Sequence, residues 1–308
     1  MSQSNNALCA NTLLMVPPSC FKFNTETGAD NEFQHHLNMT DAELQKRATQ
    51  EFDNMVARLR KFGANVLVFD DPQDNTPDAV FPNNWFSTDG NGNVYIYPMV
   101  CENRQREVKP EALVKFLEEH QYQVKNIIDV RSLAVDKAKL EGTGAMVFDH
   151  RNNSIYAAIS QRCNQVLLEQ CAQRLQVNEV LAFDTLLASG QPVYHTNVML
   201  SVGDDYAIVC AESIVSEHRQ QVLESLKDKR IIEISLEQLT AFCGNVLQIC
   251  NADGKKALVM SQTAFDAFTH EQKETLAKSG DLLAIDVPTI EAVGGGSVRC
   301  MLAEIFLP

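Results

Sequence analysis

Apolar residues follow two rhythms along this chain, and the two rhythms alternate. Over residues 44–62 the apolar positions recur at helical spacing, and the apolar run NVLVFDD after Gly63 is typical of a strand. The next stretch, AVFPNNWFSTDGNGNVYIYPM, predicts two strands joined by an Asp-Gly-Asn-Gly turn. A predicted helix over 110–122 and a predicted strand over 124–130 follow. The first part of the chain therefore reads as hairpin, helix and strand.

The same order of elements returns three times. Each return has a hairpin, then a helix of three to four turns, then a short apolar strand. The predicted hairpins cover 144–160, 193–210 and 245–261, the helices 161–175, 213–226 and 264–280, and the strands 179–185, 230–236 and 281–287. The final stretch SVRCMLAEIFLP supplies a strand that could complete the partial N-terminal unit.

These repeats make about five ββαβ modules of roughly 60 residues each, a period typical of arrays and propellers. The similarity lies in the order of the elements and not in matching letters. A circular arrangement would bring equivalent strand ends to one axis, where residues distant in sequence converge. We therefore expect an α/β fold in a single closed domain over 1–308, with its site at the centre.

Composition and charge narrow the function classes. The 308 residues are 45% hydrophobic and 21% charged, which is typical of a globular protein. A net charge of -14 argues against nucleic-acid and anionic-membrane partners, because phosphate binding needs clustered Lys and Arg. The sequence has no apolar run of the ~20 residues that a membrane span needs, and its N-terminus lacks the pattern of a signal peptide. We expect a cytoplasmic protein.

Cysteine spacing and the other short motifs give no sign of a metal or cofactor. The nine cysteines are odd in number and contain no C-x-x-C pair, so a structural zinc site is not expected. His35 and His36 lack partners at ligand spacing. GGGSVRC is no P-loop, and no G-x-G-x-x-G stands between a strand and a helix. We predict neither metal nor cofactor.

Candidate catalytic residues stand at equivalent places in the modules. Cys300 follows three glycines, His195 lies between Tyr194 and Thr196, and Glu141 precedes Gly-Thr-Gly. Taken singly, these would more often be a core thiol, a histidine paired with its neighbours and a turn carboxylate. Together they form the thiol, imidazole and acid set that nucleophilic catalysis needs. The motifs that contain such residues are DAVFPNNW (78–85), LEGTGAM (140–146), YHTNVML (194–200) and GGGSVRC (294–300).

The combined order of these motifs resembles the guanidine-modifying (pentein) superfamily, which includes arginine deiminase, dimethylarginine dimethylaminohydrolase and the amidinotransferases. The resemblance runs from about residue 12 to the end and looks closest to a bacterial amidinotransferase-like group associated with citrulline use. It is carried by LLMVPPSCFKFNTETGADNEFQ, DAVFPNNWFS, ENRQRE, LEGTGAMVFD, HTNVML and GGGSVRCMLAEIF. The resemblance implies a five-bladed α/β propeller, the pentein fold, with pseudo-fivefold symmetry.

The resemblance also implies roles for individual residues. Cys300 would be the nucleophile, His195 the general acid/base and Glu141 the acid that orients the site. Asp78 would contact substrate. Arg104 would bind the substrate's α-carboxylate, with Arg106 as the alternative because the match there is loose.

Three departures from the deiminase pattern point to a different substrate. Asn84 and Asn197 stand where deiminases usually have carboxylates, and Thr143-Gly144 replaces a common Gly-Asp pair. Exchanging charge-assisted hydrogen bonds for neutral ones weakens the binding of a guanidinium cation by a few kcal/mol, or about two decades of affinity. A neutral ureido group offers donors and a carbonyl acceptor that asparagine amides complement. Asn83, Asn84 and Asn197 are therefore predicted substrate contacts, the alternative for Asn83 and Asn84 being that they cap a turn.

The expected activity is hydrolysis of citrulline to ornithine, carbon dioxide and ammonia. Alternatives are an arginine deiminase-like or dimethylarginine hydrolase activity, transfer to an amine acceptor as in amidinotransferases, and a non-enzymatic binding protein of this fold. The expected partner is a small-molecule amino acid, and a homo-oligomer is compatible with the sequence. The sequence does not separate hydrolase from transferase.

Overall fold

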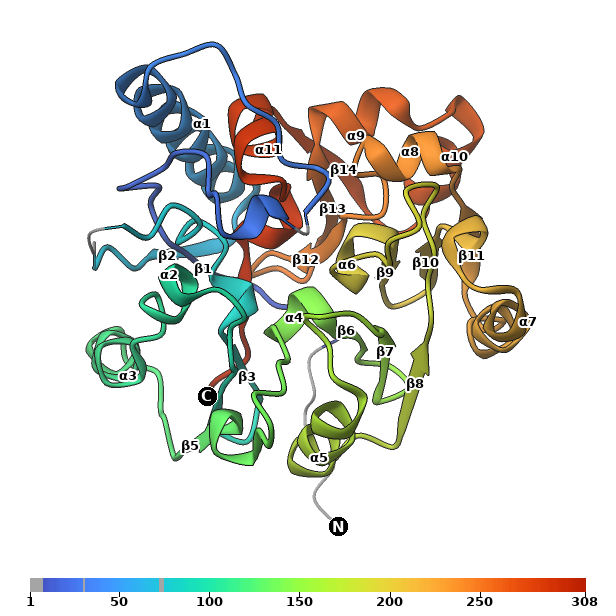
Figure 1. The fold of residues 1–308 in the computed structure, drawn as a ribbon, viewed down its shortest axis with the longest axis horizontal. Coiled ribbons are helices and arrows are strands. Elements are labelled where there is room, and N and C mark those ends of the chain that lie inside the picture. Colours follow the sequence, from blue (N-terminus) through green and yellow to red (C-terminus); the bar gives the residue numbers. More distant parts are fainter. Residues whose placement is uncertain (1–7, 30, 72–74) are drawn as a thin grey trace.

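Five small sheets form a ring in the computed structural model, which describes residues 8–29, 31–71 and 75–308 (Figure 1). Residues 1–7, part of the N-terminus in which we expected no signal peptide, lie outside the described residues. Each sheet has three strands and occupies its own sector of the ring. The ring of five modules agrees with the predicted propeller. That the chain is one domain over 1–308 stays a prediction.

Every sheet has the same topology: its central strand pairs antiparallel with an inner strand and parallel with an outer one. A helical crossover joins the central and outer strands, as parallel pairing requires. The strands are β15 (Ala303–Ile305), β1 (Thr12–Met15) and β2 (Asn65–Val68); β3 (Phe86–Thr88), β4 (Asn93–Ile96) and β5 (Asn126–Asp129); β6 (Val147–Asp149), β7 (Ser154–Ala158) and β8 (Glu179–Phe183); β9 (Leu200–Val202), β10 (Tyr206–Val209) and β11 (Arg230–Glu233); β12 (Leu247–Cys250), β13 (Lys256–Ser261) and β14 (Asp281–Ile285).

The C-terminal strand closes the ring. β15 pairs antiparallel with β1, and Leu13 lies opposite Glu304. The prediction that the last stretch of sequence completes the N-terminal module is therefore confirmed. Because Cys300 lies three residues before this strand, the closure also fixes the position of the predicted nucleophile.

The crossover helices lie on the outside of the ring, where their apolar faces cover the sheets (Figure 1). The first begins after Thr40 with a capping box and ends at Gly63, whose φ of 98° is easily reached only without a side chain. The α-helices are α1 (Asp41–Phe62), α2 (Glu102–Gln105), α3 (Pro110–Glu119), α4 (Gly142–Ala145), α5 (Gln165–Leu175), α6 (Thr196–Met199), α7 (Ser216–Ser225), α8 (Leu236–Thr240), α9 (Gln262–Ala267), α10 (His270–Leu276) and α11 (Pro288–Gly294). Within the described part of the chain, no helix has the length and apolar character to cross a membrane.

Several predicted elements differ from the structure. The first strand of the hairpin expected over 193–210 begins only at Leu200, because α6 occupies Thr196–Met199. The helix expected over 264–280 is two helices, because Phe268 leaves the helical conformation and Thr269 starts α10 with its own capping box. The strand expected before the paired asparagines is absent from this described segment. Residues 77–80 form turns, and the 3₁₀ helix η2 (Pro82–Asn84) follows. Pro82 has no N–H to donate to a strand partner, which favours the helical turn.

Short helical turns precede four of the inner strands and gather near the axis. They are η2 before β3, α4 before β6, α6 before β9, and the 3₁₀ helix η5 (Val298–Met301) before β15. α4 contacts both η2 and α6, and η5 contacts η2. The inner strands also touch across the modules, β15 with β3 and β6 with β9. The turns therefore bring four distant parts of the chain to one end of the ring axis.

Candidate active site

Five equivalent residues, one from each module, stand two or three positions before the inner strands: Asn84, Gly144, Asn197, Asn245 and Cys300. Each is followed by apolar residues that enter the core. At Gly144 an added Cβ would lie 2.3 Å from the Asn84 Nδ2 atom and 2.8 Å from the His195 Nδ1 atom, so glycine lets these groups approach. The repeat of the fold therefore builds one polar ring around the axis.

Cys300 is buried in this ring, with its backbone N–H donating to the Ser297 carbonyl at 2.9 Å. Its Sγ atom lies 3.3 Å from Asn245 Nδ2 and 3.6 Å from Asn197 Nδ2. Burial raises the pKa of the thiol, while a hydrogen bond from the Ser297 backbone to the thiol and the Asn245 amide lower it. The site therefore surrounds the Cys300 thiol with donors suited to a thiolate, while burial opposes its ionisation.

His195 and Glu141 form a buried pair, with 2.8 Å between Nε2 and the carboxylate Oε2. Burial lowers the pKa of His195, whereas the neighbouring Glu141 raises it. Burial would raise the pKa of Glu141, but that pKa lies well below its usual range because Arg162, 3.6 Å from the same oxygen, and His195 stabilise the carboxylate. Because an ionised carboxylate only accepts, Nε2 carries the proton that Glu141 accepts. The Nδ1 atom of His195 is then the unprotonated, basic nitrogen, and it faces Gly144.

Arg104 is buried and bound within the site. Its Nε and Nη2 atoms donate to Glu107, with an ion-pair distance of 2.9 Å, and Nη2 also donates to the Phe81 carbonyl. Nη1 donates to Asn84 Oδ1 at 2.8 Å. Burial raises the pKa of Glu107 to about 7, and the adjacent Arg104 opposes that rise. The role of Arg104 toward a substrate carboxylate stays a prediction, and each of its three guanidinium nitrogens already donates to a protein partner.

Two buried polar atoms at the site have no hydrogen-bond partner in the described structure, Asp78 Oδ1 and Asn84 Nδ2. The other oxygen of Asp78 accepts from Asn24 at 2.7 Å and from Thr27 at 3.0 Å. Burial raises the pKa of Asp78, and Arg104 opposes it. An unpaired buried polar atom costs about 1–3 kcal/mol, so such atoms in a cavity indicate where a ligand pairs.

Four predicted residues do not line the cavity beside Cys300. Of these, Glu141 bonds His195 and the Asn197 amide lies beside Cys300 Sγ, and the other two are Asn83 and Arg106. Asn83 is buried with both amide atoms unpaired, and its carbonyl accepts from Thr143. Arg106 is exposed and borders a separate depression beside Trp85. The side-chain amides of Asn83 and Asn84 do not cap η2, so the alternative that these asparagines serve as turn caps has no support.

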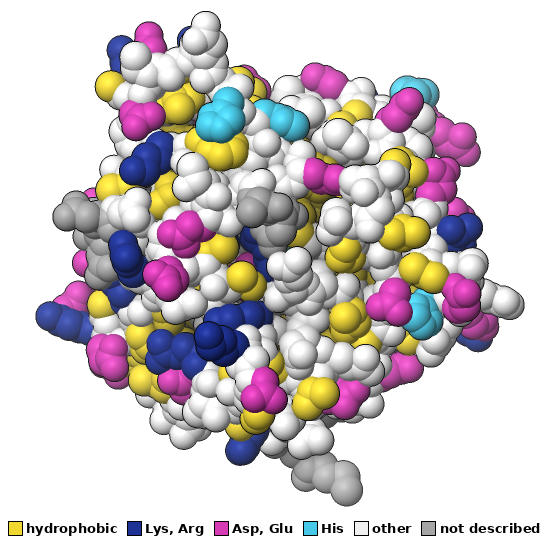
Figure 2. All heavy atoms as spheres, viewed as in Figure 1, with side chains coloured by type: hydrophobic (Ala, Val, Ile, Leu, Met, Phe, Trp, Pro, Cys, Tyr) yellow, Lys and Arg dark blue, Asp and Glu magenta, His cyan; other side chains and the backbone are white. Residues whose placement is uncertain are grey.

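The cavity beside Cys300 is small, about 10 Å³, which is room for about one water molecule. It is lined by Asn31, Asp78, Phe81, Asn84, Arg104, Arg162, Tyr194, His195, Gly294, Gly295, Gly296 and Cys300. Asn31 donates to the Gly295 carbonyl, so the segment before α1 covers this cavity. Figure 2 shows acidic side chains spread over the same face, with a small group of Lys and Arg at the lower left of the view.

Sequence reasoning missed Asn245 and Arg162. The letters GNVLQ at 244–248 repeat TNVML at 196–200 in the same register, a signal that identifies Asn245 once the modules are superposed. Arg162 follows β7, and its guanidinium lies 5.0 Å from the centre of the Tyr194 ring. No local pattern singles it out, because its place depends on how the third and fourth modules meet.

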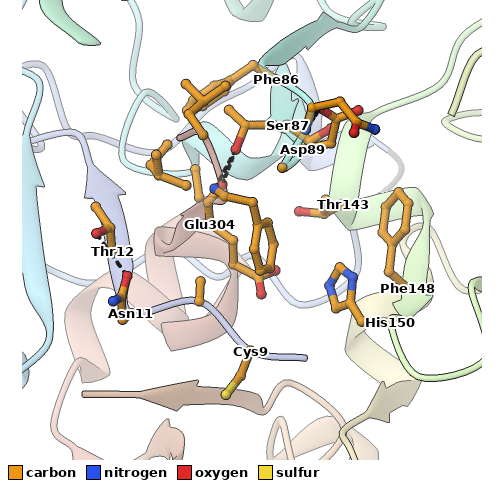
Figure 3. Close-up of a pocket in the computed structure, with 18 of the residues that line it drawn as sticks. Cys9, Asn11, Thr12, Phe86, Ser87, Asp89, Thr143, Phe148, His150 and Glu304 are labelled. Carbon is orange, nitrogen blue, oxygen red and sulfur yellow. Dashed lines mark hydrogen bonds between the residues drawn. The ribbon is translucent and has the colours of Figure 1, made fainter. Parts of the chain in front are cut away.

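A second, larger cavity lies at the other end of the inner strands (Figure 3). Its volume is about 270 Å³, and Phe148, His150 and Glu304 project into it from β6, the turn after β6, and β15. Of the predicted site residues, none lines it. Across the residues that the structure describes, no three His, Cys, Asp or Glu side chains gather as a metal site would require.

Comparisons with solved structures define the class of fold. The N-terminal domain of ArgZ, named as an arginine dihydrolase from the ornithine-ammonia cycle in Cyanobacteria, matches with a TM-score of 0.75 at 18% identity over 96% of this chain and 99% of that domain. AgrE in complex with ornithine and NAD+ matches equally well at 18% identity, over 96% of this chain and 39% of AgrE. A dimethylarginine dimethylaminohydrolase adduct with S-methyl-L-thiocitrulline matches at 13% identity and a TM-score of 0.63, over 96% of this chain and 100% of that one. These likenesses show the pentein fold.

The family is defined by a sequence match. A family model described as N,N dimethylarginine dimethylhydrolase, eukaryotic, matches residues 17–307, and the chain therefore belongs to that family. A search of curated proteins found no significant match. The superfamily resemblance seen in the motifs is confirmed, while the citrulline-using group within it stays a prediction.

Proposed function

We propose that this protein is a cysteine-dependent hydrolase of citrulline. The observation that carries the proposal is the hydrogen bond from Arg104 Nη1 to Asn84 Oδ1 at 2.8 Å. A guanidinium only donates, so it fixes which end of the Asn84 amide faces it. The Nδ2 donor is consequently the end left buried and unpaired.

A donor held in this way discriminates between the two candidate substrates. A guanidinium ion offers five N–H groups and no acceptor, so it cannot pair with Asn84 Nδ2. A ureido group has a carbonyl oxygen that accepts from this donor, and its N–H groups can donate to the unpaired Asp78 Oδ1. Pairing both atoms relieves a cost of about 1–3 kcal/mol for each. Citrulline therefore complements both unpaired atoms.

In the proposed reaction, the Cys300 proton passes to His195 Nδ1 and the thiolate attacks the ureido carbon. The electron pair of the C=O bond moves to the oxygen, and Asn84 Nδ2 is a candidate donor to it. The bond from carbon to the side-chain nitrogen then breaks as His195 protonates that nitrogen, so ornithine leaves and a carbamoyl thioester remains. Water, deprotonated by His195, attacks the thioester and releases carbamate, which yields carbon dioxide and ammonia.

Arg104 and Arg162 are both candidates for binding the substrate's α-carboxylate, because both line the cavity. Each is paired with a buried carboxylate, Arg104 with Glu107 and Arg162 with Glu141.

A second candidate substrate is arginine. The unpaired Asp78 Oδ1 is an acceptor for a guanidinium N–H, and ArgZ is named as an arginine dihydrolase. Attack by the same thiol would release ammonia first and give citrulline. An enzyme with both activities would carry arginine through to ornithine.

The test is an end-point assay of the purified protein with L-citrulline and, separately, with L-arginine, in which ornithine, citrulline and ammonia are measured. Ornithine from citrulline, absent with the Cys300→Ala variant, supports the proposal. Citrulline accumulating from arginine, with no ornithine from either substrate, would replace it with a deiminase activity. Activity only when an amine acceptor is added would indicate a transferase.

A further inference from the structure

The hydrogen bonds around Asn245 point to a function for this residue that the family resemblance does not supply. We infer that Asn245 is the positioning residue of the nucleophile, whose amide donor holds and stabilises the Cys300 thiolate. The inference rests on the proposed function in that Cys300 is taken as the nucleophile. It does not depend on which substrate enters the site.

The orientation of the Asn245 amide is fixed by the backbone around it. Its Oδ1 atom accepts from the Arg299 N–H at 3.0 Å, so its Nδ2 atom must be the end that faces Cys300. One Nδ2 hydrogen goes to the Asn197 carbonyl at 2.9 Å, and Nδ2 lies 3.3 Å from Cys300 Sγ. Both polar atoms of the fully buried Asn245 side chain therefore contact Cys300 or a backbone group beside it.

Gly244 explains why the amide can lie so close. An added Cβ at this position would fall 2.2 Å from the Val198 carbonyl oxygen, a distance that no side chain tolerates. The glycine lets the turn before β12 pack directly on α6, which brings Asn245 to the carbonyl of Asn197. The short N–H···O contact and the thiol contact both depend on this close approach.

Asn197 provides an internal comparison. Its Nδ2 atom lies 3.6 Å from Cys300 Sγ and its Oδ1 atom 3.8 Å, so neither end of this amide is directed at the sulfur in preference to the other. Asn245 is nearer and has one orientation. A fixed donor favours the thiolate over the thiol, and it counters the rise in the pKa of Cys300 that burial causes.

The experiment measures the pKa of Cys300 directly, without substrate. Iodoacetamide alkylation of the intact protein is followed by mass spectrometry of the Cys300 peptide between pH 6 and 11, for wild type, Asn245→Ala and Asn245→Asp. The Asp variant keeps the shape and the acceptor for Arg299 while it replaces the donor by a carboxylate oxygen, whose charge also opposes the thiolate. An unchanged pKa in this variant therefore contradicts the inference even where the Ala variant does not fold. Asn164→Ala, which removes an equally local hydrogen bond at the start of α5, is the matched control.

We expect both Asn245 variants to raise the pKa of Cys300 by about one unit or more, which is a tenfold or larger fall in alkylation rate at pH 7. With the substrate that the wild type turns over, kcat should fall about 10- to 100-fold while KM changes less than threefold. Asn164→Ala should alter neither quantity. An unchanged pKa of Cys300 in a folded Asn245 variant would overturn the inference. Failure of the proposed substrate would leave the alkylation result unaffected, so the two hypotheses fail separately.

Discussion

The cavity beside Cys300 and the cavity beside Glu304 lie at opposite ends of the same inner strands, and their polar atoms are paired differently. In the large cavity, Asp89 accepts from Asn93 and Tyr95, and Thr88 bonds the backbone of β15 and the residue that follows it. In the small one, Asp78 Oδ1 and Asn84 Nδ2 are buried and unpaired.

The volume of a cavity therefore does not identify the catalytic site in this fold. The large cavity has about 270 Å³ against about 10 Å³ for the small one. Yet the small one holds the Glu141–His195 pair, a thiol with oriented donors, and two unpaired atoms that cost stability. Buried unpaired polar atoms of residues that line a cavity, unlike those of Asn83, indicate where a ligand can complete the hydrogen bonding.

Replacement of the nucleophile should have the largest effect. Cys300→Ala removes covalent catalysis, and kcat should fall by about 10⁴-fold or more, as measured by ornithine release from citrulline. Cys171→Ala, a buried thiol packed against β7 in another module, is the matched control and should keep most of the activity. An equal loss of activity in Cys300→Ala and Cys171→Ala would indicate that the active site does not lie in this cavity.

Glu141→Gln should rank second. The neutral amide no longer selects the His195 tautomer that is protonated on Nε2, and it leaves Arg162 without its carboxylate. We expect kcat to fall about 10²- to 10⁴-fold. Because Glu141 raises the pKa of His195, its loss should move the acid limb of the kcat profile to lower pH. If the acid limb of the kcat profile stays at the same pH in Glu141→Gln, a group other than His195 causes that limb.

Asn84→Asp should change the choice of substrate more than the rate of catalysis. Arg104 still binds one carboxylate oxygen, but the site then presents an acceptor in place of the Nδ2 donor. The ratio of kcat/KM for citrulline to that for arginine should fall about 100-fold, by the balance of charge-assisted and neutral hydrogen bonds. Asn83→Asp is the neighbouring control, since Asn83 does not line the cavity. An unaltered ratio would remove Asn84 as the specificity residue.

Glu304→Gln, the same substitution at the other end of the strands, should have the smallest effect. Glu304 pairs with Arg299 at 3.3 Å and lines the large cavity. We expect kcat/KM within about threefold of wild type and a loss of stability of roughly 1–2 kcal/mol, measured by urea unfolding. A loss of activity as large as that of Glu141→Gln would show that the two ends are coupled.

The order of elements was predictable because hydrophobic periodicity and turn residues act locally. The modules and the closing role of the C-terminal strand followed from the pattern, and the structure confirms them. The break between α9 and α10 was missed because capping by Thr269 competes with a continuous apolar face. The turn at Pro82 was missed because an apolar run was read as a strand without regard to the missing N–H.

The site was predictable only in part, for a physical reason. Resemblance selected Cys300, His195 and Glu141, which the fold brings to one cavity or into direct contact with it. The pairing of Arg104 with Glu107 depends on side-chain direction, which letters do not encode. Arg162 enters the site through packing between modules, and Asn245 becomes visible only when the repeats are superposed.

The central claim is that Arg104 orients Asn84 so that its donor meets the carbonyl of a ureido group. The most direct measurement is a crystal structure of the Cys300→Ser variant with L-citrulline bound. The account predicts the ureido oxygen within hydrogen-bonding distance of Asn84 Nδ2, a ureido nitrogen against Asp78 Oδ1, and the contact from Arg104 to Asn84 intact. A ureido oxygen turned away from Asn84, with Nδ2 still unpaired, would contradict it.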